Sequence, residues 1–274
     1  MLEILKAILF GIVEGITEWL PISSTGHMIL LNDLIHLNVS KEFYSLFEVV
    51  IQLGAILAVV IIYFKTIWPF GAKTKRQSRA VINLWGKIIV ACLPAAVIGI
   101  LFDDWLDAHL YNSFVVALML IIYGIIFIVI ETKEMGTRDT KKLSAITYKQ
   151  ALGIGAFQLL SLIPGTSRSG ATIIGGLILG LERSIAAEFT FFLAIPVMAG
   201  ASLLKVLKYI LKVGLIFKAS EVMLLLVGCF VAFIVSVLVI KFLMSYIRKH
   251  DFKVFGYYRI VLGIVVLLYF LLLK

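Results

Sequence analysis

The chain has 274 residues, of which 62% are hydrophobic and only 15% are charged, and its formal net charge is +9. So apolar a composition excludes a soluble globular domain, and the long unbroken apolar runs exclude the alternating strands of a β-barrel. No basic face with aromatic stacking platforms is visible, so we expect contacts with membrane lipids and no nucleic-acid partner. The sequence predicts an all-α polytopic membrane protein, with residues 1–274 forming one integral membrane domain.

The apolar runs are of two kinds. A membrane-spanning helix needs about 20 apolar residues, and six runs qualify as transmembrane helices: roughly 44–64, 87–102, 114–131, 186–204, 222–244 and 257–273. Residues 3–36 and 150–182 are also apolar, but polar residues and proline interrupt them. We expect each to form a re-entrant helical hairpin, because broken backbone is tolerated at membrane depth only where protein or a water-filled cavity covers it.

Charges between the runs indicate orientation. The connections at 65–87, 131–150 and 245–256 are rich in Lys and Arg, whereas 103–113 carries three Asp and no Lys or Arg. The excess of Lys and Arg in cytoplasmic loops predicts that the basic connections and the termini lie on opposite sides, with the termini external. The 205–221 connection disagrees, because it should be external and yet holds four lysines. We expect it to form an amphipathic helix on the surface.

The two halves of the chain, about 1–135 and 145–274, match each other. Each is one broken hairpin followed by three spans, and the breaks share a short motif in which Pro21–Ser24 corresponds to Pro164–Ser167. Because three spans separate the hairpins, the second enters from the opposite face. This predicts an inverted repeat whose two breaks meet near the middle of the membrane.

The first hairpin carries two acids, Glu14 and Glu18. Their spacing of four places both carboxylates on one helix face, where they repel each other unless they share a proton or a cation. We expect a divalent cation here, Mg²⁺ or Ca²⁺, since both prefer carboxylate and phosphate oxygens. The alternative is a pair of helix-end carboxylates that reach the lipid headgroups.

Hydroxyls and an imidazole follow these acids. Pro21 ends the helix, since it cannot continue the hydrogen-bond ladder. Ser24 precedes His27 by three residues, so one helical turn could bring hydroxyl and imidazole together, and His27 could move a proton near neutral pH. Ser23 and Thr25 are candidates for binding phosphate, and helix capping is the alternative role for these hydroxyls.

The second hairpin carries Arg168 as the only charge between Lys149 and Glu182. Its planar guanidinium suits bidentate binding of phosphate, and a helix over 169–181 would present free N–H groups to the same anion. The alternative is an ion pair between Arg168 and an acid of the other half. Both roles are compatible if the ion pair forms only when substrate is absent. The two breaks together give the predicted phosphate-binding set: Ser23, Thr25, Thr166, Ser167, Arg168, Ser169 and Gly170.

Glu48 and Gln52 share one face of the first uninterrupted span, so we expect them to support the site. Glu188 is the matching acid of the second half. The other charges near span ends are expected at the membrane interface: Glu182, Arg183, Lys205 and Arg259.

The motifs at 14–27, 47–54 and 164–172 resemble those of the bacitracin-resistance type of undecaprenyl-diphosphate phosphatase, and the resemblance covers essentially the whole chain. It implies a bacterial inner-membrane enzyme that converts undecaprenyl diphosphate, a polyprenyl diphosphate lipid, to the monophosphate for peptidoglycan synthesis. It further implies bacitracin resistance, an inverted-repeat fold, an active site that opens to the external side and a supporting divalent cation. The functional residues that it implies are Glu14, Glu18, Ser24, His27 and Arg168.

These residues predict metal-assisted phosphoryl transfer, in which Arg168 holds the diphosphate. Ser24, activated by His27 or Glu18, is the first candidate for the nucleophile; His27 itself and a metal-activated water are the others. A secondary transporter or lipid flippase with the same architecture is the alternative function. The sequence leaves the assembly open, including a homodimer.

Overall fold

The protein is helical throughout the part of the chain that its computed structural model describes, residues 1–71, 74–214 and 218–273. The elements in chain order are α1 (Leu2–Thr17), α2 (Ser24–Ile35), α3 (Lys41–Ile62), α4 (Phe64–Ile67), η1 (Pro69–Gly71), α5 (Lys75–Leu110), α6 (Ser113–Thr132), η2 (Leu143–Ala145), α7 (Tyr148–Leu159), η3 (Leu160–Leu162), α8 (Arg168–Ile178), α9 (Arg183–Val213), α10 (Ala219–Tyr246) and α11 (Lys253–Leu273).

The six predicted spans are confirmed as α3, α5, α6, α9, α10 and α11, each long and apolar enough to cross a membrane. Two predicted connections are wrong. The helix of α5 begins at Lys75 and runs to Leu110, through most of the connections expected at 65–87 and 103–113. Lys and Arg are good helix formers, so a charged flank does not by itself end a helix. Lys73 and the side chains of Asp103, Asp104 and Asp107 lie outside the described part.

The connection expected at 205–221 is also largely helix. It does not form a separate surface helix, because α9 continues without a break to Val213 and α10 begins at Ala219. Residues 215–217 lie outside the described part. Lys205, Lys208 and Lys212 therefore lie on the extension of a membrane-spanning helix, and Lys218 lies at the start of α10.

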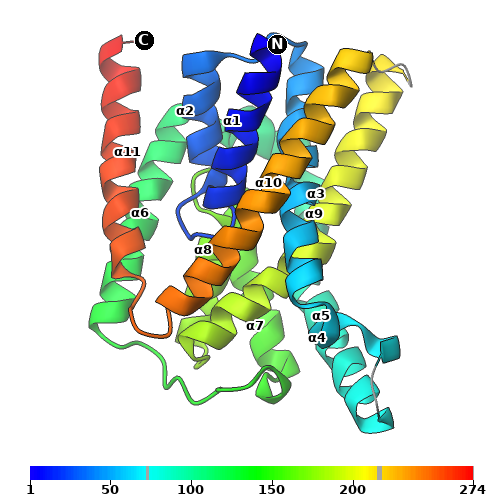
Figure 1. The fold of residues 1–274 in the computed structure, drawn as a ribbon. Helices are drawn as coiled ribbons and strands as arrows, with labels where there is room; N and C mark the ends of the chain where they lie inside the picture. Colours follow the sequence, from blue (N-terminus) through cyan, green and yellow to red (C-terminus); the bar gives the residue numbers. More distant parts are fainter. Residues whose placement is uncertain (72–73, 215–217, 274) are drawn as a thin grey trace.

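Both predicted helical hairpins form, and their re-entry into the membrane stays a prediction. Helices α1 and α2 are separated by residues 18–23, and α7 and α8 by η3 and the irregular segment that follows it. The α1–α2 hairpin lies in the upper half of Figure 1 and the α7–α8 hairpin in the lower half, so the two breaks come together near the middle of the molecule. Both chain termini lie at the upper end.

Packing between the halves follows a reciprocal pattern. Helix α1 packs on α10 and α7 packs on α5, while α3 contacts α9 and α6 contacts α11. Gly11 of α1 lies against the carbonyl of Gly228, and Gly155 of α7 lies against the carbonyl of Ala91, so each hairpin approaches a span of the other half through a glycine. Such an exchange of partners is what two halves related by a two-fold axis require. The inverted relation itself stays a prediction.

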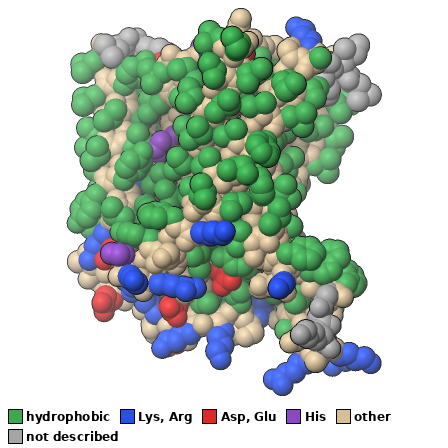
Figure 2. Space-filling model, in the orientation of Figure 1, with side chains coloured by type: hydrophobic (Ala, Val, Ile, Leu, Met, Phe, Trp, Pro, Cys, Tyr) green, Lys and Arg blue, Asp and Glu red, His purple; other side chains and the backbone are tan. Residues whose placement is uncertain are grey.

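One face of the molecule is apolar over most of its height and charged at its lower end. In the face that Figure 2 shows, hydrophobic side chains cover most of the upper part, and Lys and Arg gather at the lower end. On α10, for example, Leu226, Phe230 and Leu238 are exposed at spacings that place them on one face. Exposed apolar faces of this extent suit a helix that meets lipid tails.

Candidate active site

The two breaks have the same local structure. Ser23 and Ser167 both adopt positive φ angles, 71° and 72°. Each caps the helix that follows: Ser23 Oγ accepts from the Gly26 N–H at 3.4 Å, and Ser167 Oγ accepts from the Gly170 N–H at 3.2 Å. The capping role that the sequence left open therefore belongs to Ser23 in the first hairpin and to Ser167 in the second.

This geometry shifts the correspondence between the two motifs by one residue: Ser167 corresponds to Ser23 and not, as the sequence match predicted, to Ser24. Because Ser23 corresponds to Ser167, the partner of Ser24 in the other half is Arg168, the first residue of α8. The second break has one more residue between its proline and its cap, which the short sequence match could not show. The nucleophile candidate and the cation thus occupy the same position, at the first turn of α2 and of α8.

An ion pair joins the two halves at this point. Nη2 of Arg168 lies 2.6 Å from Oε1 of Glu18, with only 12% and 7% of the two side chains exposed. Nη1 of Arg168 donates to the carbonyl of Thr190 at 2.9 Å, and the guanidinium lies 5.9 Å from the centre of the Trp19 ring. Within the described chain, the buried Nε of Arg168 has no hydrogen-bond partner. One N–H donor of the guanidinium therefore has no acceptor among the described residues.

Glu18 also binds Ser24. The Ser24 hydroxyl donates to Oε2 of Glu18 at 2.9 Å, so one carboxylate contacts both the hydroxyl of the first half and the guanidinium of the second. Ser169 Oγ donates to the backbone carbonyl of Glu18 at 3.0 Å, which fastens the start of α8 to the end of α1. The predicted approach of the two clusters is confirmed, with Glu18 as the link between them.

Glu14 is the most buried acid of the site, with 1% of its surface exposed. Its carboxylate interacts electrostatically with Glu18, Glu48 and Arg168. Oε1 of Glu14 is buried and, among the described residues, has no hydrogen-bond partner. A buried carboxylate oxygen without a donor is costly, and a bound cation would satisfy it. The described chain contains no cluster of three or more His, Cys, Asp or Glu around a metal site. Mg²⁺ nevertheless fits two carboxylates, since it usually takes one or two from the protein and the rest from substrate phosphates and water.

His27 contacts a residue that sequence reasoning missed. Its Nδ1 lies 2.7 Å from the carbonyl of Ser23, and its Nε2 lies 2.7 Å from the hydroxyl of Tyr258, on α11. Since a carbonyl can only accept, Nδ1 carries the hydrogen in neutral His27 and Nε2 accepts from Tyr258. The expected contact between His27 and Ser24 is replaced by this one, because the Ser24 hydroxyl turns to Glu18.

Arg259 is the main residue that the sequence interpretation placed wrongly. It was expected at the interface, but it is fully buried. Its guanidinium donates to the carbonyl of Pro21 at 3.0 Å in the first break and to those of Gly165 at 2.9 Å and Thr166 at 2.8 Å in the second. It also lies 5.6 Å from the centre of the Tyr123 ring. Arg259 is the only charge between Lys253 and Lys274, and that isolation inside an apolar run is the signal that could have found it.

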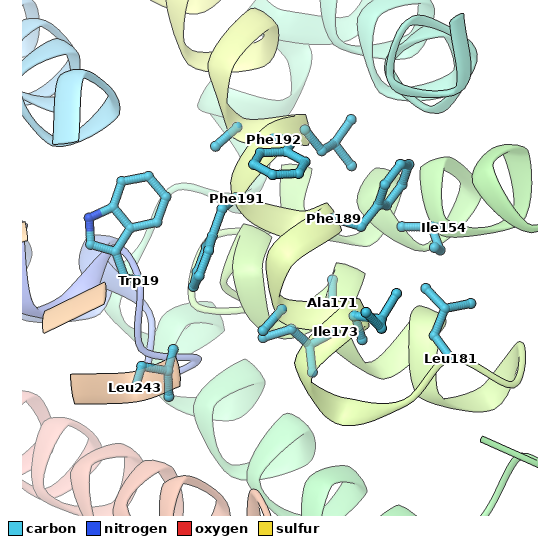
Figure 3. Packing of buried hydrophobic residues seen from close by; sticks show 14 of the residues in the cluster. Trp19, Ile154, Ala171, Ile173, Leu181, Phe189, Phe191, Phe192 and Leu243 are labelled. Carbon is cyan, nitrogen blue, oxygen red and sulfur yellow. The ribbon is translucent and has the colours of Figure 1, made fainter. Parts of the chain in front are cut away.

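An aromatic core holds the first break in place. Trp19, which is fully buried, packs edge-to-face on Phe191 of α9, with ring centres 5.3 Å apart and an interplanar angle of 87°. Figure 3 shows these two rings facing each other beside Phe192, with Ala171 and Ile173 of α8 close by. The residue after Glu18 is thereby anchored to the other half, which limits how far the carboxylate can move.

The other predicted residues fall into two groups. Glu48 interacts electrostatically with Glu14 of the site, whereas Glu188 interacts electrostatically with Arg248. The remaining predicted residues lie at the breaks or on α3 without a described side-chain contact to the acids: Gln52, Thr25 and Thr166.

Comparisons with known proteins show relatives that match nearly the whole chain. Residues 7–265 match the family model described as bacitracin resistance protein BacA. A protein of Enterococcus faecalis named undecaprenyl-diphosphatase is 61% identical over 97% of both chains. Proteins of Desulfitobacterium hafniense (undecaprenyl-diphosphatase, 61% identical over 98% of this chain and 97% of the relative) and Clostridioides difficile (undecaprenyl-diphosphatase 1, 58% identical over 100% and 98%) are also similar. The match to the family model includes the sequences of both breaks.

We predict that Arg259→Lys destabilises the protein by about 2 kcal/mol or more, because one ammonium cannot reach the carbonyls of both breaks and leaves buried acceptors unsatisfied. Thermal unfolding of the purified protein in detergent measures the loss. Arg248→Lys, at an exposed position between α10 and α11, is the matched control and should change little. Equal unfolding temperatures for the two variants would show that Arg259 does not hold the breaks together.

Proposed function

The chain belongs to the bacitracin resistance protein BacA family, and we propose that it hydrolyses undecaprenyl diphosphate to undecaprenyl phosphate and inorganic phosphate. This reaction recycles the carrier lipid for peptidoglycan synthesis and gives resistance to bacitracin. The protein is a multi-pass membrane protein, and its family suggests the bacterial cytoplasmic membrane. The observation that carries the proposal is the contact of Ser24, Glu18 and Arg168, which unites a hydroxyl, a base and a phosphate-binding cation at the junction of the two halves.

The diphosphate binds between the two breaks. Helices α2 and α8 both begin there, and helix N-termini attract anions through their free N–H groups and the positive end of the helix dipole. Arg168 adds a full positive charge. Its guanidinium binds the phosphate through Nε, which has no partner among the described residues, and through an N–H group that otherwise donates to Glu18. Since phosphoryl transfer depends mainly on positioning and charge neutralisation, these groups supply most of what the reaction needs.

Ser24 is the nucleophile in this mechanism. Its hydroxyl already donates to Glu18, so Glu18 takes the proton as the Ser24 oxygen attacks the terminal phosphorus. The bond between that phosphorus and the bridging oxygen breaks, and undecaprenyl phosphate leaves. Water then attacks the phosphorus of the phosphoserine and gives a proton to a base of the site. The bond between phosphorus and the Ser24 oxygen breaks, Glu18 returns its proton to that oxygen, and inorganic phosphate leaves. His27 and a water molecule remain the other candidates for the attacking group, but the described geometry favours Ser24 because the base is already bound to it.

His27 and Tyr258 form a proton path beside this centre. The Nε2 atom of His27 accepts from the Tyr258 hydroxyl and the Nδ1–H bond to Ser23 fixes the ring. Nε2 is therefore the atom that takes up a proton, and the imidazolium can then give that proton to the leaving phosphate oxygen. The half-exposed Tyr258 side chain connects His27 with the outside of the bundle.

Glu14 and Glu18 would hold the divalent cation, Mg²⁺ or Ca²⁺. The fit rests on the buried oxygen of Glu14 that has no donor in the described chain. When bound, the cation would neutralise phosphate charge. We infer that the site opens to the external side, because the basic connections at 65–87, 131–150 and 245–256 predict a cytoplasmic side opposite to the termini.

We predict that Arg168→Lys lowers kcat/KM for undecaprenyl diphosphate about 100-fold, because lysine keeps the charge but not the planar fork that spans Thr190 and Glu18. Phosphate release by purified protein measures it and also tests the proposed function directly. Arg138→Lys, which alters a salt bridge with Glu131 away from the site, is the control. Near-normal turnover in Arg168→Lys, or no phosphate release by the unaltered protein, would contradict the proposal.

We predict that a chelator abolishes phosphate release, that added Mg²⁺ or Ca²⁺ restores it, and that Glu14→Gln raises the cation concentration for half-maximal activity about tenfold. The amide removes the negative charge that the cation needs while keeping the shape of the side chain. Glu188→Gln, an acid that interacts with Arg248, should leave the requirement unchanged. Full activity in excess chelator would assign Glu14 and Glu18 to proton transfer alone.

A further inference from the structure

A basic pocket lies between α3 and α9, away from the central site. Its volume is about 350 Å³, and its walls are formed by Lys41, Glu42, Ser45, Lys205, Lys208, Tyr209 and Lys212. Four lysines and one acid thus face a common space. The three lysines of α9 belong to the four that disagree with the charge pattern of the other connections.

Helix geometry explains how the lysines converge. Lys205, Lys208 and Lys212 follow one another at spacings of three and four, so they share a face of α9. Lys41 is the first residue of α3, which packs on α9. Like charges on neighbouring helix positions repel, so this arrangement carries an electrostatic cost that a bound anion would offset.

The charges of the pocket are only partly balanced. Glu42 pairs with Lys212 at 3.0 Å. Lys41 and Lys205 make no ion pair with an acid among the described contacts within 4 Å, and Lys205 is half-buried. Ammonium groups act as point-charge ligands of phosphate, and the Ser45 hydroxyl adds a further donor.

A polar stripe connects the pocket with the central site. Lys41, Ser45, Glu48 and Gln52 are spaced by four, three and four residues and therefore line one face of α3. Lys205 interacts electrostatically with Glu48, and Glu48 with Glu14. The line of charges that begins at Arg168 therefore ends in the basic pocket, at the end of the molecule where the termini lie (Figure 1).

We propose that this pocket binds a phosphate group at the end of the α3 stripe. The group comes either from the inorganic phosphate that the central site releases or from the headgroup of an anionic lipid at this membrane surface. The first source rests on the proposed function, and the second does not. In the first case the pocket binds phosphate transiently as it leaves the protein. In the second case the pocket binds a lipid headgroup of the surrounding membrane.

Direct binding tests the proposal. The full chain is placed in nanodiscs of phosphatidylcholine, and inorganic phosphate is titrated by calorimetry; in a second series, phosphatidylglycerol is added and the lipid retained by the protein is counted by native mass spectrometry. The test variant is Lys41→Gln with Lys205→Gln. Lys41→Arg with Lys205→Arg retains the charges, and Lys65→Gln with Lys249→Gln removes two exposed lysines elsewhere.

We expect the glutamine pair to weaken the binding of one probe about tenfold, the arginine pair to keep it, and the control pair to change nothing. Loss confined to inorganic phosphate identifies the product, and loss confined to phosphatidylglycerol identifies the lipid. Unchanged binding of both probes, or an equal loss in the control pair, would overturn the proposal and leave the lysines as side chains that reach toward the headgroups. Because both series measure binding without turnover, an inactive protein would overturn the proposed function and leave this result intact.

Discussion

A charge at membrane depth is costly unless an opposite charge or a set of dipoles meets it, and the pair of Glu18 and Arg168 meets that condition. The two residues belong to different halves and to two helices that stop inside the bundle. Their contact fixes where the breaks meet, places the Ser24 hydroxyl on the same carboxylate, and directs two helix N-termini at one point. The ion pair that balances the buried charges at the breaks therefore also brings the reactive groups together.

The broken backbone also needs hydrogen-bond donors, since the free carbonyls at the breaks have no water to bind inside the bundle. Arg259 meets it from α11 by donating to both breaks. The described ion pairs give it no acidic partner, so carbonyl dipoles balance its charge. Two arginines thus stabilise the junction in different ways. Arg168 binds a carboxylate that takes part in the proposed reaction, and Arg259 binds backbone carbonyls that do not.

Much of this was predictable from the sequence, because apolar run length and interrupting charges respond directly to the membrane. The six spans, the two hairpins and the meeting of Glu18 with the Arg168 cluster follow from those rules. The lengths of α5 and α9 could not be predicted from the same rules, since a helix can continue past the membrane wherever its residues favour helix. The role of Arg259 and the His27–Tyr258 contact also escaped, because α11 reaches the breaks only through tertiary packing. The one-residue shift between the motifs depended on φ at Ser23 and Ser167, which no pattern of residue types specifies.

The central claim is that Glu18 and Arg168 stabilise the junction as a pair, and a double-mutant cycle measures it most directly. Glu18→Gln, Arg168→Gln and the combined variant are unfolded reversibly in detergent, and their free energies of unfolding are compared. Each single change leaves a buried charge without its partner and should cost about 3 kcal/mol. The combined variant should then cost at least about 2 kcal/mol less than the sum of the two. Additivity within about 0.5 kcal/mol would contradict the account, because it would mean that the two halves are held together by other contacts and that the ion pair only accompanies them.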